Sequence, residues 1–399
     1  MRGRRAAAGA LATLGLLLLP AAVMAHWATV QVVETERFVE ALAPLADDPA
    51  VQDRIIVEVA ALVDEQVDIS GVTADLLSGL GEALELSDRA RDALDLVSEP
   101  IAAGVRALVE DVVGDVVRSP TFSSAWASSV ELLHAQTILL LSGSPDSVLE
   151  LDRDGALRLP LGPIVAEVRA ALIAQGVPFA AAIPEVDRSI VLAELPNLAL
   201  ARVVYQVGVA VGVWLPWITA ALIGAALLLA PRRATTLRSI GVLTAMVAAL
   251  LAIGFALART ALTAYAGPES SAVVGAVFDA VLGYATTTIL ALLAVGVLAA
   301  LLGWWLGASP VAARWRAALR EALASARAAR ERSGFRLGRV GVAMHRYRVP
   351  LRLTLLGLAA LPALLNPPLS VLSVMASAAL AVGLIVLAEV FMSEPEPAT

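Results

Sequence analysis

Charged residues are confined to separate blocks, and long uncharged apolar runs lie between them. Of the 36 Asp and Glu residues, 29 fall between Glu34 and Glu194. All 29 basic residues are arginine, and ten of them fall between Arg314 and Arg348. A bilayer core about 30 Å thick needs roughly 20 apolar residues in a helix, and the runs between the blocks reach that length. With a mean hydropathy of +0.80, the pattern predicts a mainly α, polytopic helical membrane protein.

We expect about six spans. Residues 1–30 form an N-terminal span or signal anchor, although Val23-Met24-Ala25 also resembles the cleavage site of a secretory signal. Residues 204–306 hold spans two to four. Residues 349–391 hold two more, because Asn366-Pro367-Pro368 interrupts an apolar run that is too long for one crossing. A re-entrant hairpin is the alternative for the first of these two.

The arginine distribution predicts the orientation, since short cytoplasmic segments of membrane proteins are rich in arginine and lysine. Three arginines precede the first span, three lie between spans two and three, and ten lie in 307–348 against two glutamates. Both termini, including the short acidic tail 392–399, are therefore expected in the cytoplasm of a cell-membrane protein. Residues 31–203 are expected outside, and the block 26–205 has 29 acids against 11 arginines, a net charge of −18.

The extracytoplasmic segment 31–203 is long enough to bury its own core. Asp48-Pro49 is a good N-cap and first helical residue. Apolar spacing predicts further helices near 72–82, 88–97, 98–117, 121–141 and 163–174. The pattern changes at Val148–Leu159, which predicts a β-hairpin, and Ser189–Leu192 could add a strand. We expect a mostly helical domain that carries a small β-hairpin or sheet.

Several kinds of catalytic chemistry are disfavoured by composition. The chain has no cysteine and no lysine, which removes thiolate nucleophiles, cysteine metal sites and Schiff bases. Its three histidines, His26, His134 and His345, lie in three different predicted segments, and His134 is best explained as a packing or helix-surface residue. We expect no catalytic residue and no cofactor.

A metal site is not expected either. Glu150, Asp152 and Asp154 resemble part of a calcium loop. Arg153 intervenes, however, the later ligands of an EF-hand are missing, and a hairpin turn explains the same residues. The acidity of the domain is explained by a solvated surface, with binding of divalent cations or of a basic partner as the alternative.

Two arrangements of polar residues stand out near the predicted membrane. Arg259 and Asp279 lie at the ends of spans three and four, on either side of a loop predicted around Tyr265–Ser271. They are predicted to pair near the outer interface; two independently solvated residues are the alternative. Acidic residues are missing from the middle of every predicted span, which disfavours proton-coupled transport.

The cytoplasmic segment 307–348 contains the second arrangement. Ser309-Pro310 precedes an apolar stripe at helical spacing. Five arginines surround the stripe and predict a basic face that lies on anionic head groups of the inner leaflet: Arg314, Arg316, Arg320, Arg327 and Arg330. Nucleic-acid binding is not expected.

The order of several short motifs resembles a family of actinobacterial multi-pass membrane proteins of no established function. The family has one N-terminal span, a large extracytoplasmic domain and several C-terminal spans, and it lends no catalytic residues. The motifs are Thr35–Val39, Ala43–Gln52, Ser119–Phe122 with Trp126 ahead of His134, Ile183-Pro184, Trp214-Leu215-Pro216, Val277-Phe278-Asp279 and Asn366-Pro367-Pro368. Topology alone also resembles half of a resistance-nodulation-division transporter and the mechanotransmitting ABC permeases.

These observations favour a non-enzymatic envelope protein whose outer domain binds a partner or a wall component. A transport-related subunit is the first alternative. An enzyme that acts on lipid-linked substrates is the second, with Arg259 and Asp279 as its obvious polar pair at the interface.

Overall fold

A computed structural model describes residues 2–143, 150–151, 156–160, 189–194, 198–332, 344, 346–365 and 369–392. The described residues are mainly helical, as the sequence predicted. The chain divides into two compact units. The bundle unit comprises Met1–Trp27, Val211–Ala258 and Leu282–Thr399, and the arm unit comprises Ala28–Ala210 and Arg259–Val281. Three long helices contribute residues to both units.

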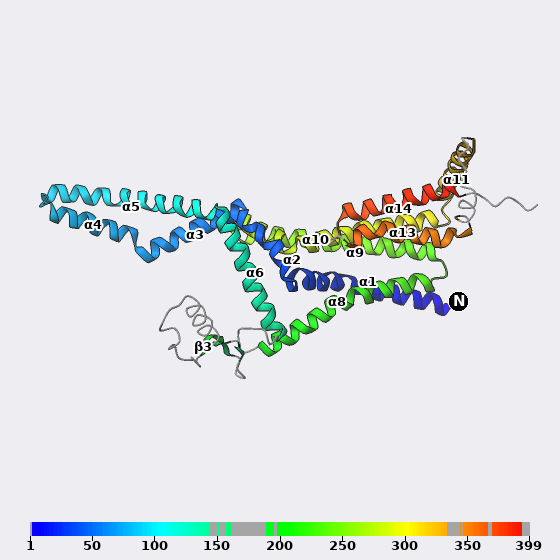
Figure 1. The fold of residues 1–399 in the computed structure, drawn as a ribbon, viewed down its shortest axis with the longest axis horizontal. Helices are drawn as coiled ribbons and strands as arrows, with labels where there is room; N and C mark the ends of the chain where they lie inside the picture. The colour runs from blue at the N-terminus through cyan, green and yellow to red at the C-terminus, as the bar shows by residue number, and fades with distance from the viewer. Residues whose placement is uncertain are drawn as a thin grey trace, which may run out of the picture. The chain divides into compact units, whose positions relative to one another are not determined.

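Among the described residues, long helices supply the bundle unit (Figure 1). They are α1 (Arg2–Trp27), α8 (Leu198–Leu229), α9 (Arg233–Tyr265), α10 (Gly267–Leu306), α11 (Pro310–Arg332), α13 (Arg348–Leu365) and α14 (Val371–Phe391). A small core joins three of them: Val23 of α1, Ala248 of α9 and Ile289 of α10 are buried together. In the same unit, α13 packs along α14.

Five helical stretches are long and apolar enough to cross a membrane. They are Gly3–Val33, Leu200–Leu229, Arg233–Tyr265, Gly267–Leu306 and Val371–Phe391. These lengths and compositions are compatible with an integral, multi-pass membrane protein. The apolar part of α13, Pro350–Ala363, is shorter, so a sixth pass stays a prediction. The Asn366-Pro367-Pro368 break lies outside the described residues.

Glycines allow α9 and α10 to approach closely. A Cβ atom on Gly241 would lie 2.3 Å from the backbone nitrogen of Ala300, and one on Gly303 would lie 2.4 Å from that of Arg238. A Cβ on Gly296 would lie 2.6 Å from the backbone nitrogen of Ala245. Lipid tails are as apolar as the side chains, so close backbone contact through small residues is a main source of helix association in a bilayer.

This packing predicts a specific cost for a larger residue at Gly241. Gly241→Leu should destabilise the protein by about 1–3 kcal/mol because the new side chain must displace backbone atoms of α10. Gly254→Leu in the same helix is the matched control, since nothing lies within 4 Å of its Cβ position. Thermal unfolding in detergent measures both variants. Equal unfolding temperatures would contradict the close contact.

The arm unit is built mainly from consecutive helical segments. They are the π-helical η1 (Ala28–Val33), α2 (Thr35–Leu42), the 3-10 helix η2 (Ala43–Asp47), α3 (Pro49–Val67), α4 (Ile69–Ala83), α5 (Asp88–Val117) and α6 (Pro120–Ser142). The predicted start of α3 is confirmed, because Asp48 accepts hydrogen bonds from the backbone N–H groups of Ala50 (2.9 Å) and Val51 (3.2 Å). Ser119 caps α6 in the same way through Phe122.

Two sequence-based boundaries are wrong. The predicted break between 97 and 98 is absent, and α5 is one helix with Pro100 inside it. Proline removes one backbone hydrogen bond, but α3 and α4 pack along α5 on the two sides of this point and hold it helical. The predicted loop at Tyr265–Ser271 is also largely helical, because Gly267 turns the chain with a φ of +76° and α10 begins there with Pro268 in its first turn.

We call α3, α4 and α5 together the arm. Figure 1 shows α4 and α5 side by side, joined by a short turn, so the two helices are antiparallel. Arg106 of α5 lies at their junction with α3: its Nε donates to Asp64 at 3.0 Å, and its Nη1 donates to Glu99 at 3.1 Å. Arg106 also donates to the hydroxyl of Ser70. The hydrogen bond to Glu99 contributes most to raising the pKa of Arg106.

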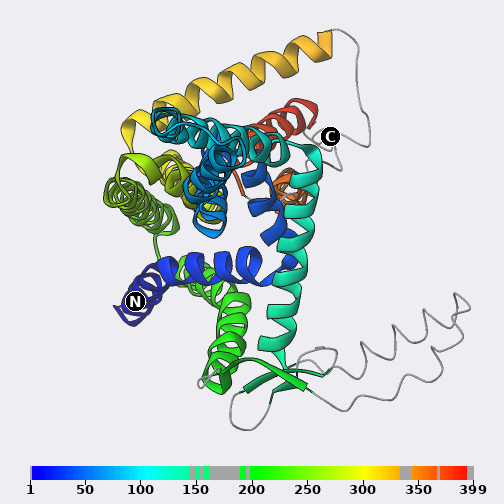
Figure 2. The ribbon, with the colours of Figure 1, turned by 90° about the vertical axis from the view of Figure 1, so that its left-hand side faces the viewer.

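Three strands follow α6. They are β1 (Glu150–Leu151), β2 (Ala156–Pro160) and β3 (Ser189–Glu194), paired antiparallel in the order β1-β2-β3. Figure 2 shows them near the end of α6. The turn at 152–155, which contains the calcium-loop candidates Asp152 and Asp154, lies outside the described residues, and so does the helix predicted at 163–174.

Candidate interaction surface

A stripe of large apolar side chains is exposed along α5. The inner face of α5, which packs on α3 and α4, includes Ala102, Arg106, Val109, Val113 and Val117, each buried or half-buried. The residues one position earlier are all apolar, and between 38% and 62% of each is exposed. They are Ile101, Val105, Leu108, Val112 and Val116. Intervals of three and four residues keep them on one side of the helix.

The other two helices of the arm repeat this arrangement. In α4, Ile69 and Thr73 are buried, whereas Val72, Leu76 and Leu80 are 45%, 64% and 53% exposed. In α3, Ile56 and Ala60 are buried, whereas Val59 and Leu62 are 36% and 55% exposed.

Helix geometry places the three stripes on one side of the arm. Successive residues are rotated by about 100° around a helix axis. In a pair of antiparallel helices, consider in each helix the residue that directly precedes a contact position. Because of this rotation, these residues of the two helices point to the same side of the pair. Since α5 runs antiparallel to its neighbours, the stripes join into one surface, which we call the apolar face. It contains Val59, Leu62, Val72, Leu76, Leu80, Ile101, Val105, Leu108, Val112 and Val116.

The apolar face is large for a surface in contact with water. Ten aliphatic side chains, each about half exposed, present on the order of 800 Å². The largest apolar patch on a typical monomer is roughly 300–600 Å². An area of this size equals the contribution of one partner to a standard protein–protein interface, and exposed apolar patches of this size are typical of interaction sites.

Acidic residues border the apolar face. Asp75 directly precedes Leu76 in α4, and Asp111 and Asp115 directly precede Val112 and Val116 in α5; the three acids are exposed. Small residues such as Ala74 and Ala103 follow the buried positions on the other side. An apolar surface with an acidic border is complementary to an apolar strip flanked by arginine or lysine.

A buried histidine fixes the start of the arm unit. His134 of α6 is 8% exposed; its Nδ1 lies 3.0 Å from the hydroxyl of Thr35, and its Nε2 lies 2.9 Å from the carbonyl oxygen of Val32. Its ring stacks on Phe38 of α2, with 4.0 Å between centroids. Because a carbonyl only accepts, Nε2 carries the proton that is donated to Val32. His134 is therefore a packing residue, one of the two roles that the sequence favoured.

Other contacts tie α6 to the segment between α2 and α3. The indole N–H of Trp126 donates to the carbonyl of Leu42 at 3.0 Å, and the hydroxyl of Ser123 donates to Asp47 at 2.6 Å. The motifs at Thr35–Val39, Ala43–Gln52 and Ser119–His134 thus meet at one place, here called the α2–α6 junction. Sequence reasoning singled out these motifs but missed their convergence, because about 80 to 100 residues separate the partners along the chain.

The junction predicts a local effect for His134→Ala. Loss of the stacked ring leaves the carbonyl of Val32 without this donor and should destabilise the arm unit by about 2–3 kcal/mol. Leu133→Ala is the control, because Leu133 is the adjacent residue and is 69% exposed. Hydrogen exchange should show faster opening of α2 and α6 in His134→Ala alone. Unchanged protection in both variants would contradict a stabilising role.

The structure brings Arg259 and Asp279 together. The Nε and Nη2 atoms of Arg259 donate to the two carboxylate oxygens of Asp279 at 2.8 and 2.7 Å. The pair joins α9 to α10 near their connecting turn. The two side chains are 46% and 58% exposed, so solvent screens the pair and its contribution to stability is small. This bidentate contact is suited to fixing the relative position of two helices.

A charge swap tests the pair. Arg259→Asp and Asp279→Arg should each lower the unfolding temperature slightly, since each places two like charges side by side. The double variant should recover the loss. A double-mutant cycle on thermal unfolding in detergent measures the coupling, and no recovery in the double variant would show that the contact contributes nothing.

Three of the five arginines of α11 donate to carbonyls of neighbouring helices, and the lipid-facing role of the five stays a prediction. Arg316 donates to the carbonyls of Trp305 and Gly307 at the end of α10. Arg327 and Arg330 donate to the carbonyls of Glu389 and Val390 at 2.7 and 2.8 Å, near the end of α14. The last carbonyls of a helix lack intrahelical donors and carry partial negative charge, which explains the attraction. The remaining two, Arg314 and Arg320, are exposed.

The side chain of Glu389 in α14 binds two arginines from different helices. Its carboxylate accepts a hydrogen bond from Arg327 at 3.0 Å and one from the Nε of Arg352 at 3.1 Å. Arg352 of α13 is thereby paired with Glu389 of α14. The contacts hold α11, α13 and α14 together.

The histidines have separate environments. His26 of α1 lies 3.5 Å from the hydroxyl of Tyr284 in the bundle unit, whereas His134 belongs to the arm unit. His345 lies outside the described residues. Within the described ranges, no group of three or more His, Asp or Glu side chains could hold a metal ion.

Comparison with protein-family models, with curated proteins and with solved structures found no match to this chain. The apolar face is the feature of the described residues that most needs a functional explanation, because it leaves a large apolar area exposed.

Proposed function

We propose that this chain is an integral membrane protein of the bacterial cell envelope that binds a partner protein through the apolar face of its arm. The single observation that supports this role is the size and continuity of the face on three packed helices. Leaving such a surface in water is unfavourable by roughly 25 cal/mol per Å² relative to burying it. A partner that covers the face removes this cost.

The acidic border defines the class of partner. A helix or helical hairpin with an apolar stripe and flanking arginine or lysine would cover the leucines and valines and place its cations near Asp75, Asp111 and Asp115. A second copy of the arm fits less well, because it would bring two acidic borders together. An anionic lipid surface is disfavoured for the same reason.

The proposed topology places the arm outside the cell. Six passes with both termini in the cytoplasm agree with the arginine distribution, and the arm and the small sheet then belong to the extracytoplasmic domain. The role that we propose is non-enzymatic. The resemblance to actinobacterial multi-pass membrane proteins supports an envelope location.

Site-specific photo-crosslinking in cells identifies the partner. A photoreactive residue at Leu76 or Leu108, which are 64% and 62% exposed, should give a discrete adduct. The same residue at Ala74 or Ala103, on the side away from the face, should not. An adduct with a permease or ATPase would favour a transport-related subunit, and an adduct with a second copy would show self-association. Absence of any adduct from the face positions would contradict the proposal.

Charge introduced into the face should abolish binding of the identified partner. The double variant Leu76→Glu with Leu108→Glu should weaken binding at least about 100-fold, because central interface side chains contribute on the order of 2 kcal/mol each. The double variant Ala74→Glu with Ala103→Glu adds the same charge elsewhere on the arm and is the control. Affinities of full-length protein in nanodiscs measure the difference. Equal weakening in both variants would show that added charge, and not the face, is responsible.

A further inference from the structure

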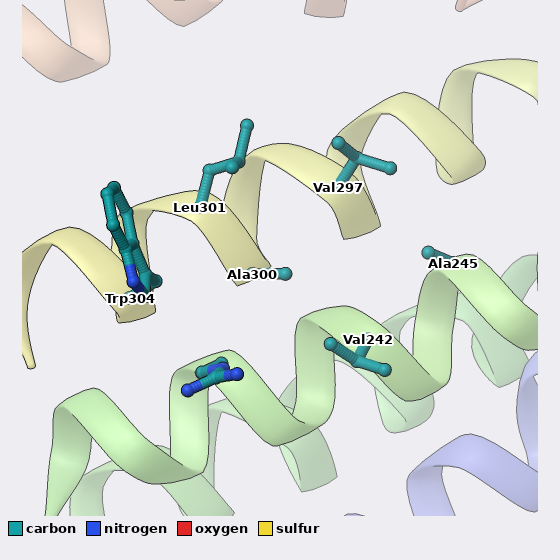
Figure 3. Close-up of a pocket in the computed structure, with 7 residues that line it drawn as sticks. Val242, Ala245, Val297, Ala300, Leu301 and Trp304 are labelled. Atoms are coloured by element: carbon teal, nitrogen blue, oxygen red, sulfur yellow. The ribbon is translucent and has the colours of Figure 1, made fainter. Parts of the chain in front are cut away.

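A groove lies on the bundle unit between α9 and α10. It has a volume of about 330 Å³ and is lined by Arg238, Val242, Ala245, Val297, Ala300, Leu301 and Trp304. Figure 3 shows Val242 and Ala245 on one helix opposite Val297, Ala300, Leu301 and Trp304 on the other.

The small residues that bring the helices together also shape this groove. Ala245 and Ala300 lie where the two backbones are closest, beside Gly296 and Gly241. The larger side chains of Val242, Val297 and Leu301 stand on either side and are 50%, 43% and 54% exposed. The groove is therefore apolar and open to the surroundings of the bundle. Seven residues separate Arg238 from Ala245, which makes the groove about 10 Å long at 1.5 Å per residue.

One end of the groove is polar. Arg238 is exposed, and its backbone lies against Gly303 of α10, so its position relative to the groove is fixed. Trp304 is half-buried at the same end. Arginine and tryptophan are typical of the level at which lipid head groups meet the hydrocarbon core. The segment Pro231–Arg238 contains three arginines and no acid, so the local charge is positive.

We infer that the groove binds one anionic phospholipid. The guanidinium of Arg238 binds the phosphate, for which its planar donors are well suited. The first part of an acyl chain lies over Ala245 and Ala300, between Val242 on one side and Val297 and Leu301 on the other. The positive charge of the adjoining segment favours a head group with a net negative charge over a zwitterionic one. This site is independent of the arm and requires only that the bundle lies in a bilayer.

Native mass spectrometry of the full chain tests the site. The protein is delipidated in detergent and titrated with phosphatidylglycerol or with phosphatidylcholine of the same chain length. We expect one phosphatidylglycerol to bind at least about tenfold more tightly than further phosphatidylglycerol molecules and than phosphatidylcholine, because phosphatidylcholine has the same phosphate but no net negative charge. Arg238→Gln should remove this tight binding. Arg233→Gln, which loses the same charge at a residue that does not line the groove, should retain it.

A second pair of variants separates the apolar groove from general attraction to charge. Val297→Trp should fill the groove and weaken phosphatidylglycerol binding at least about tenfold, the change expected for loss of roughly 1.4 kcal/mol. Val295→Trp is the control, because Val295 is equally exposed at 43% but does not line the groove. The proposal is overturned if the two lipids bind equally, if Arg238→Gln and Arg233→Gln behave alike, or if Val297→Trp binds as the wild type does. Inorganic phosphate that competes as well as the lipid would also overturn it.

Discussion

In the integral membrane protein that we propose, the need to pair every backbone polar group inside a bilayer governs the bundle unit. A helix pairs its own N–H and C=O groups everywhere except at its ends, so the long apolar segments are helical. The groups that still need a hydrogen-bond partner are the N–H and C=O groups at the helix termini. The arginines of α11 meet that requirement by donating to carbonyls at the ends of α10 and α14. Helix α11, which the sequence predicts to lie on the lipid surface, thus also supplies hydrogen-bond donors to neighbouring helices.

The arm unit faces the opposite physical problem. Its many acidic residues are suited to contact with water. However, α3, α4 and α5 leave a continuous row of leucine, isoleucine and valine side chains exposed. Helix–helix contacts within the arm use only one face of each helix. The exposed apolar stripe beside that face can be buried only by another surface. For that reason we propose that the arm binds a partner protein. The groove between α9 and α10 follows the same logic in a lipid environment, where the surface that completes it is a lipid.

Local sequence signals predicted many of the elements correctly. Asp48 with Pro49 and Ser119 with Pro120 mark helix starts because capping depends on neighbouring residues only. The predicted break between residues 97 and 98 is wrong because packing by α3 and α4 outweighs the one hydrogen bond that Pro100 removes. The GPESS sequence after Ala266 was read as a loop, although a glycine with positive φ followed by proline can also start a helix.

The sequence by itself determined the apolar lengths, the separation of acids from arginines and the opposite charges of Arg259 and Asp279, because these depend on composition and spacing. Only the tertiary structure decided which distant residues meet: His134 with Thr35 and Val32, Glu389 with Arg327 and Arg352, and Gly241 with Ala300. It also decided that the apolar stripes of three helices share one side. Such contacts arise from how helices pack, and periodicity along one helix carries no information about the rotation of its neighbour.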